Sequence, residues 1–197
     1  VPIGVLAAVY LSEFSPKPVA RWIRFATNVL SGVPSIISGV FAFGLIVATT
    51  KSFSAVAGGI ALAVLMLPII VRTTDEALQI VPQEVRWASV GLGASKYTTA
   101  LRVVVPAALP AILTGVTLSV ARAAGETAPL IFTALFSFFW PQGLFEPTPS
   151  LAVLVYNFAI VPFKAQQELA WAASLILVFI VLLASVLARL AVRGNHR

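Results

Sequence analysis

The stretch from Val81 to Pro110, VPQEVRWASVGLGASKYTTALRVVVPAALP, decides the fold that we expect for the whole chain. In it, charged residues alternate with apolar ones at spacings that suit a short amphipathic helix. Gly91 and Gly93 interrupt this pattern, because glycine adopts backbone angles that end a helix. Pro106 and Pro110 stand where a new helix is expected to start, since proline is tolerated in a first turn. The stretch therefore predicts a bent helical segment between two long apolar helices.

The chain as a whole has the composition of a membrane protein. Of its 197 residues, 59% are hydrophobic and only 10% are charged. Soluble domains carry about 25% charged residues, so we predict an all-α protein that crosses the membrane several times as one domain, residues 1–197. The chain has no cysteine, and its single histidine, His196, lies in a basic tail, so no metal site or cofactor is expected.

Five membrane spans are expected along the chain. They cover approximately residues 1–14, 36–50, 55–71, 106–136 and 169–190. The first apolar run is too short to cross a bilayer, so we expect the native N-terminus to precede Val1. The fourth stretch is too long for one straight crossing, so a bend is expected at Gly125 and Pro129. Residues 151–163 predict a re-entrant or interfacial helix.

The basic residues predict the orientation in the membrane. Ten of them fall on the side of the bent segment, and only Lys51 and Lys164 fall on the other side. Because cytoplasmic loops carry an excess of lysine and arginine, we expect the bent segment and the C-terminus in the cytoplasm. Lys17, Arg21 and Arg24 alternate with apolar residues, which predicts an interfacial amphipathic helix. This distribution of the net charge of +6 is typical of membrane topology and not of nucleic-acid binding.

Two charged residues lie within the fourth apolar stretch, in SVARAAGETAPLIF (119–132). An arginine at mid-bilayer costs about 2.5–3.5 kcal/mol on insertion scales, so Arg122 needs a partner or a polar cavity. Glu126 follows one helical turn later and can pair with it. Two interpretations stay open: an ion pair that steadies a kinked helix, or a guanidinium that binds an anion through two parallel hydrogen bonds.

The bent segment resembles the EAA motif of ABC-importer permeases. The match falls on Trp87, Ala88, Ser89, Gly93, Val103, Val105 and Pro106. Trp87 and Ser89 replace the glutamate and the second alanine of the motif, and Glu84 lies one helical turn earlier. The resemblance implies a MetI-like permease core of about five transmembrane helices with a cytoplasmic coupling segment, residues 81–105. The residues that it implies for ATPase coupling are Glu84, Arg86, Trp87, Ala88, Gly93, Ala94, Lys96 and Tyr97.

Residues 122–130, RAAGETAPL, resemble a stretch of the phosphate ABC-transporter permeases of the Pst type. Similar stretches are LPII (67–70), GVPSI (32–36) and PAALP (106–110). The Ala-Pro after Gly-Glu-Thr is similar to the PstA-type half of the permease pair. The resemblance implies an importer of inorganic phosphate in the bacterial inner membrane, with Arg122, Glu126 and Thr127 on the substrate pathway.

The same resemblance implies several partners. They are a PstC-like permease as the second half of a heterodimer, two PstB-like ATPase subunits, a periplasmic PstS-like phosphate-binding protein and membrane lipid. The chain has no GxxxxGK[ST] stretch, so we expect a partner to hydrolyse ATP and this chain to be no enzyme. The expected spans also hold no His, Cys or Asp that could form a nucleophile and base pair.

Two alternatives stay open at this point. An arginine does not by itself discriminate among tetrahedral anions, so sulfate or molybdate could replace phosphate as the substrate. A secondary transporter would also use broken helices and intramembrane charge. It would be expected to show an internal repeat, and none is visible in the sequence.

Overall fold

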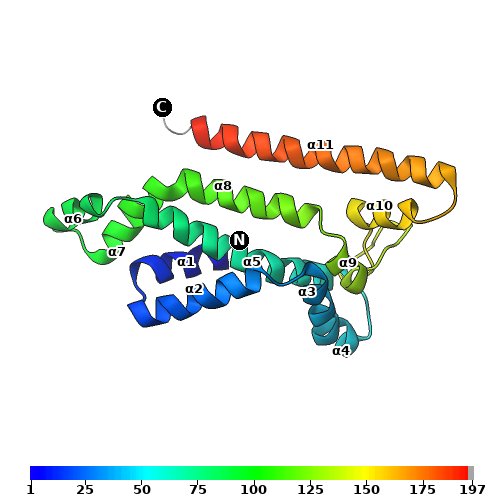
Figure 1. Cartoon of the computed structure of the whole chain (residues 1–197), viewed down its shortest axis with the longest axis horizontal. Helices are drawn as coiled ribbons and strands as arrows, with labels where there is room; N and C mark the ends of the chain where they lie inside the picture. The colour runs from blue at the N-terminus through cyan, green and yellow to red at the C-terminus, as the bar shows by residue number, and fades with distance from the viewer. Residues whose placement is uncertain (195–197) are drawn as a thin grey trace. The chain divides into compact units, whose positions relative to one another are not determined.

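The computed structural model describes residues 1–194, and all regular elements in this range are helices (Figure 1). Contacts divide the chain into two compact units, each of which combines segments that are distant in sequence. Unit 1 comprises Val1–Gly32, Met66–Ser119 and the described residues from 187 onward, and unit 2 comprises Val33–Leu65 and Val120–Val186.

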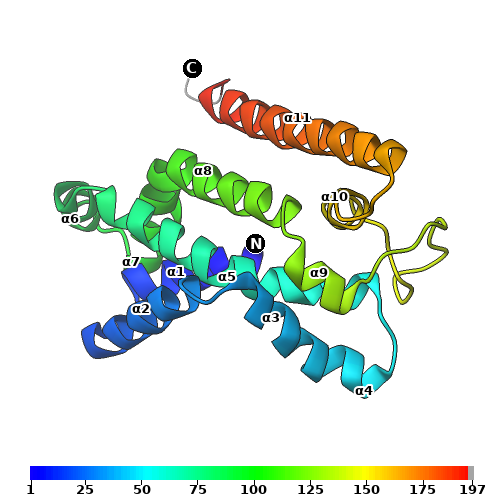
Figure 2. The ribbon, with the colours of Figure 1, turned by 45° about the vertical axis from the view of Figure 1, so that its right-hand side comes forward.

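Unit 1 contains the predicted coupling segment. Its elements are α1 (Pro2–Glu13), α2 (Lys17–Ser31), the second half of α5 (Ala55–Ile80), α6 (Gln83–Gly91), α7 (Lys96–Thr99), the π-helical turn η2 (Ala100–Val104) and most of α8 (Val105–Ala124). In Figures 1 and 2, α1 and α2 lie side by side as an antiparallel pair. The core of this unit is apolar and draws on α1, α5, η2 and α8, with Val9, Leu78, Val104 and Ile112 all buried. Burial of these side chains places the coupling segment at the end of a packed bundle.

Unit 2 contains the predicted intramembrane charges. Its elements are α3 (Ser35–Ala42), the π-helical turn η1 (Phe43–Val47), α4 (Ala48–Thr50), the first part of α5, α9 (Ala128–Thr133), α10 (Leu151–Ala159) and most of α11 (Lys164–Gly194). Figure 2 shows α3 next to α9. A long loop connects α9 to α10. The backbone N–H groups of Ala55 and Val56 donate to carbonyls of this loop at Glu146 and Leu144. The loop thereby satisfies donors at the N-terminus of α5 that would otherwise lack partners.

The helix boundaries agree with most of the expected spans and correct two expectations. The bend near Gly125 and Pro129 is confirmed, because α8 ends at Ala124 and α9 begins at Ala128. Pro106, in contrast, does not start a new helix, since helical structure runs without a break from Lys96 to Ala124. The π-helical turn η2 ends at Val104, two residues before Pro106, whose missing N–H and bulky ring disturb the preceding helical turn.

The second correction concerns the length of the helices. α5 extends to Ile80, beyond the expected end at residue 71, and therefore includes Asp75. Among the described residues, three helices are long and apolar enough to cross a membrane: Ala55–Ile80, Lys96–Ala124 and Lys164–Leu187. Lys17–Ser31 and Ser35–Thr50 pass the same criteria only together, as a pair bent by 98°, and α1 has 12 residues. Three of the five expected spans thus correspond to full-length helices, the expected span 36–50 is the second arm of the bent pair, and the expected span 1–14 is the short helix α1.

A glycine allows α3 to approach α9 closely. A Cβ atom at Gly39 would lie 2.7 Å from the Cα of Pro129, so an alanine there would force the two backbones apart. Overpacking of this kind costs about 1–3 kcal/mol. We expect Gly39→Ala to lower the thermal unfolding midpoint of the detergent-purified protein, whereas Gly44→Ala, whose Cβ would meet no atom of the described residues within 4 Å, should not. Equal midpoints for the two variants would contradict the close packing of α3 on α9.

Candidate functional site

Arg122 and Glu126 form an ion pair at the point where α8 ends. The Nε of Arg122 lies 3.5 Å from Oε1 of Glu126, which is a long and therefore weak contact. The Glu126 side chain is only 13% exposed, whereas that of Arg122 is 49% exposed. No other hydrogen bond of Arg122 occurs among the described residues. The guanidinium thus has donors available for an additional anion, while the carboxylate is largely enclosed by protein.

Thr127, the third predicted residue of the substrate pathway, lies in the break between α8 and α9. Its hydroxyl donates to the carbonyl oxygen of Ala152 on α10 at 3.4 Å, so it faces α10. The break is held by hydrogen bonds from the N–H of Gly125 to the carbonyl of Arg122 and from the N–H of Glu126 to the carbonyl of Ala123. The structure therefore brings the three predicted residues together on one short turn, with Arg122 the most accessible of them.

The coupling segment has the predicted shape. α6 ends at Gly91, and Gly93 follows with a φ of +85°, a left-handed conformation that only glycine adopts without strain. Ser95 then caps α7 by accepting a hydrogen bond from the N–H of Thr98 at 3.2 Å. Of the residues predicted for ATPase coupling, six are exposed: Glu84, Trp87, Ala88, Gly93, Lys96 and Tyr97. Ala94 is half-buried, so most of the predicted set forms an accessible surface.

Arg86 is the exception in this set, because it points into unit 1. Its Nη2 lies 2.9 Å from Oε1 of Glu13 on α1 and donates to the carbonyl of Leu78 at 2.9 Å. Nη1 donates to the carbonyl of Val81. The side chains of Arg86 and Glu13 are only 14% and 12% exposed. Arg86 therefore joins α6 to α1 and satisfies carbonyl groups at the C-terminal end of α5.

Two further contacts hold the coupling segment. The ring of Tyr97 stacks on that of Phe14, at the end of α1, with 4.8 Å between centroids. The hydroxyl groups of Ser89 and Thr99 lie 2.9 Å apart and join α6 to α7. Because Glu13 and Phe14 are neighbours, the end of α1 contacts the coupling segment on both sides of its bend.

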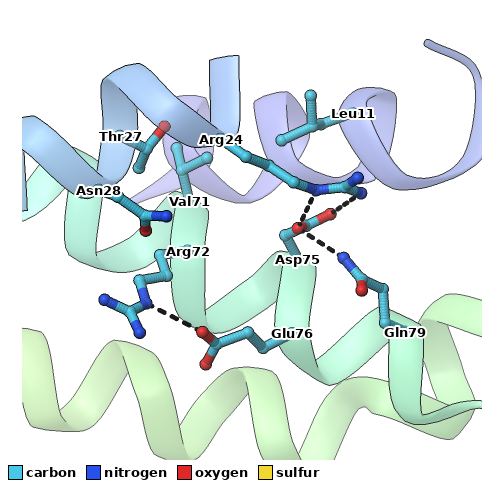
Figure 3. A pocket seen from close by; sticks show the side chains of 9 residues that line it. All are labelled: Leu11, Arg24, Thr27, Asn28, Val71, Arg72, Asp75, Glu76 and Gln79. Carbon is cyan, nitrogen blue, oxygen red and sulfur yellow. Dashed lines mark hydrogen bonds and ion pairs between the residues drawn. The ribbon is translucent and has the colours of Figure 1, made fainter. Parts of the chain in front are cut away.

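A polar cluster on α5 has no counterpart in the sequence predictions. Figure 3 shows Arg24 of α2 directed at Asp75 of α5, with Gln79 on the same carboxylate. Nε and Nη2 of Arg24 lie 2.7 and 3.0 Å from the two oxygens of Asp75, a bidentate geometry. The Asp75 side chain is only 6% exposed, so its carboxylate is buried. This cluster borders a cavity of about 200 Å³ and ties α2 to α5.

The sequence shows one half of this cluster, the carboxylate of Asp75, but does not identify its cationic partner. Asp75 lies among the residues that extend α5 beyond its expected end, where a buried carboxylate requires a cationic partner. That partner is 51 residues away, and no local spacing pairs Arg24 with Asp75. On the same helix, Arg72 pairs with Glu76 at 2.9 Å, and both side chains are more than half exposed.

Comparison with known proteins gives a consistent result over the whole chain. The family model described as "Binding-protein-dependent transport system inner membrane component" matches residues 1–197. The phosphate transport system permease protein PstA of Yersinia pestis is 42% identical over 189 residues, which are 95% of this chain and 64% of that protein. The PstA protein of Haemophilus influenzae is 43% identical over 190 residues, 96% of this chain and 67% of that protein. The chain therefore spans only part of the length of these relatives.

A solved structure agrees with the fold. A chain from the MetNI methionine ABC transporter in an inward-facing conformation, in its CY5 native crystal form, superposes with a TM-score of 0.83. The match covers 100% of this chain and 87% of that chain at 21% sequence identity. At this identity the likeness concerns the fold alone, and it confirms the expected all-α, MetI-like arrangement of helices.

Proposed function

Since the chain belongs to the family of binding-protein-dependent transport system inner membrane components, we propose that it is the PstA-type permease subunit of an ATP-driven importer of inorganic phosphate. The predicted resemblance to ABC-importer permeases is confirmed. The proposal of phosphate as the substrate rests on one observation. The half-exposed Arg122 guanidinium lies beside an enclosed Glu126 where a membrane helix is broken. Relatives named as phosphate permeases support the same substrate.

The chemistry of the pair favours phosphate among the tetrahedral anions. The guanidinium of Arg122 offers a planar fork of donors to two anion oxygens. An ionised Glu126 can only accept hydrogen bonds. Phosphate near neutral pH still carries a proton that it can donate to such a carboxylate, whereas sulfate carries none and would be repelled. Arg122 and Glu126 together therefore suit a protonated oxyanion, and Thr127 holds the turn on which both lie.

The proposed mechanism separates transport from ATP hydrolysis. A PstB-like ATPase dimer would contact the exposed surface of the coupling segment, formed by Glu84, Trp87, Ala88, Gly93, Lys96 and Tyr97. Closure of the ATPase would displace α6 and α7, and this motion would change access to the phosphate site near Arg122. A PstC-like permease would complete the translocation pathway, and a PstS-like protein would deliver phosphate from the periplasm. We place the protein in the bacterial inner membrane, with the coupling segment and the C-terminus in the cytoplasm.

The bend of the coupling segment gives a matched pair of variants. Gly93→Val would force a β-branched residue to a φ of +85°, at a cost of about 1–2 kcal/mol for the left-handed conformation. Gly91→Val introduces the same side chain two residues earlier, in α6. At either position a Cβ atom meets nothing within 4 Å in the part of the chain that the structure describes. We expect Gly93→Val to reduce phosphate uptake per ATP hydrolysed in proteoliposomes, and Gly91→Val to change it much less. Unchanged coupling in both variants would exclude the bend as a transmission element.

Co-purification tests the proposed class of transporter. The chain is extracted from membranes with an affinity tag, and the bound proteins are identified by mass spectrometry. An ATPase subunit and a second permease are expected to co-purify with the tagged protein. A protein that purifies without any nucleotide-binding subunit, yet still transports phosphate in a proton- or sodium-dependent manner, would instead be a secondary transporter.

A further inference from the structure

A basic groove lies between α1 and α2, and the proposed transport reaction does not use it. Its volume is about 570 Å³, and its polar lining comes from Ser12, Ser15, Lys17, Arg21 and Arg24, together with Asn28. Both helices belong to unit 1, so the groove is part of one compact body. Three cations around one groove are donors suited to an anionic oxygen ligand.

Two of the three cations in the groove carry uncompensated charge. Arg24 is neutralised by its bidentate contact with Asp75. None of the ion pairs among the described residues involves Lys17 or Arg21, and both residues are exposed. The groove therefore has a positive potential that this part of the chain does not balance.

An exposed apolar surface adjoins the groove on α2. This helix buries only Ala20 and Thr27. Trp22 and Phe25 project outward, 71% and 59% exposed, and their rings meet edge to face with centroids 6.1 Å apart. Phe25 also lines the groove, so the cationic and apolar surfaces are continuous. A helix with a basic side and a wide aromatic side is suited to the boundary between lipid headgroups and acyl chains.

We propose that the groove between α1 and α2 binds the headgroup of an anionic phospholipid such as phosphatidylglycerol. Lys17 and Arg21 pair with the phosphate, and the acyl chains lie along Trp22 and Phe25. Free phosphate could use the same cations but would leave this apolar surface uncovered. The assignment to a lipid rests on the continuity of the two surfaces and is independent of which anion is transported.

Lipid retention measures this binding directly. The intact transporter is purified, delipidated and incubated with mixed micelles of phosphatidylglycerol and phosphatidylcholine in equal amounts, and native mass spectrometry records the lipids that stay bound. The test variant is Lys17→Gln with Arg21→Gln. The control is Lys51→Gln with Lys164→Gln, which removes the same charge from two exposed positions outside the groove. Since a basic residue near an anionic lipid surface contributes about fivefold in affinity, the test variant should lose phosphatidylglycerol preference by about 25-fold.

The outcomes separate lipid binding in the groove from binding of a free anion and from a general effect of positive charge. The control variant is expected to keep the wild-type preference for phosphatidylglycerol, and excess inorganic phosphate is expected to displace little of the bound lipid. Equal losses in the test and control variants, or no loss in either, would overturn the proposal. Displacement of phosphatidylglycerol by inorganic phosphate would make the groove a site for the free anion and would likewise overturn it. Equal thermal unfolding midpoints of the variants confirm that the exposed substitutions leave the fold intact.

Discussion

Replacing Arg122 with alanine is expected to abolish most phosphate uptake while the transporter still assembles. The substitution removes the donors at the break of α8 but deletes only a long, half-exposed ion pair within the chain. Hydrogen bonds to charged groups contribute about 1.5–3 kcal/mol, which corresponds to a loss of about 10- to 100-fold in uptake rate at low phosphate. The measurement is uptake of radiolabelled phosphate by proteoliposomes that contain the complete transporter.

Two comparisons distinguish the anion site from a structural ion pair. Arg122→Lys keeps the charge but lacks the planar fork of donors, so we expect it to recover only part of the uptake. Lys164→Ala, which removes a cation from an exposed position, should leave uptake unchanged. If Arg122→Ala instead prevents assembly, or unfolds the protein at a much lower temperature, the pair with Glu126 has a structural role and the anion must bind elsewhere.

Removing Arg86 is expected to produce the largest loss of stability in the coupling segment. Arg86→Met leaves Glu13 as an unpaired buried carboxylate and leaves the carbonyls of Leu78 and Val81 without this donor. Breaking a buried ion pair by removing one partner costs about 3–5 kcal/mol. We therefore expect a clear fall in the thermal unfolding midpoint. We also expect a lower amount of phosphate taken up per ATP hydrolysed.

A double-mutant cycle isolates the ion pair from the other contacts of Arg86. Glu13→Leu combined with Arg86→Met replaces both charges by apolar groups, which is often nearly neutral for stability. The double variant should therefore be more stable than Arg86→Met alone. Additive effects of the two substitutions would mean that Glu13 and Arg86 do not interact in the membrane-embedded protein.

The bend of the coupling segment could be predicted from the sequence because its cause is local. Gly93 adopts the positive φ expected of a glycine that ends a helix, and the charges around it made α6 recognisable as a surface helix. The break between α8 and α9 was likewise predictable, since Gly125 and Pro129 lie within a run too long for one crossing. Local backbone preferences and the thickness of the bilayer are enough for such features.

The direction of individual charged side chains could not be predicted. Arg86 was expected on the ATPase-facing surface, but its partner Glu13 is 73 residues away on α1. Asp75 likewise finds Arg24 across 51 residues. Pairs of this kind are set by the packing of α1, α2 and α5, which no spacing within a single helix reveals. The sequence also predicts the end of α5 too early, at residue 71 instead of Ile80. A charged residue such as Asp75 is expected outside an apolar helix unless its buried partner is known.

Competition between anions tests the proposed substrate most directly. The complete transporter is reconstituted with its ATPase and binding protein, and ATP-dependent uptake of radiolabelled phosphate is compared with that of radiolabelled sulfate. We expect phosphate to accumulate and sulfate to be neither transported nor competitive, because of the two anions only phosphate carries a proton that it can donate to Glu126. Uptake of sulfate at a rate equal to or above that of phosphate, or accumulation without ATP, would contradict the assignment of this chain as a phosphate-importer permease.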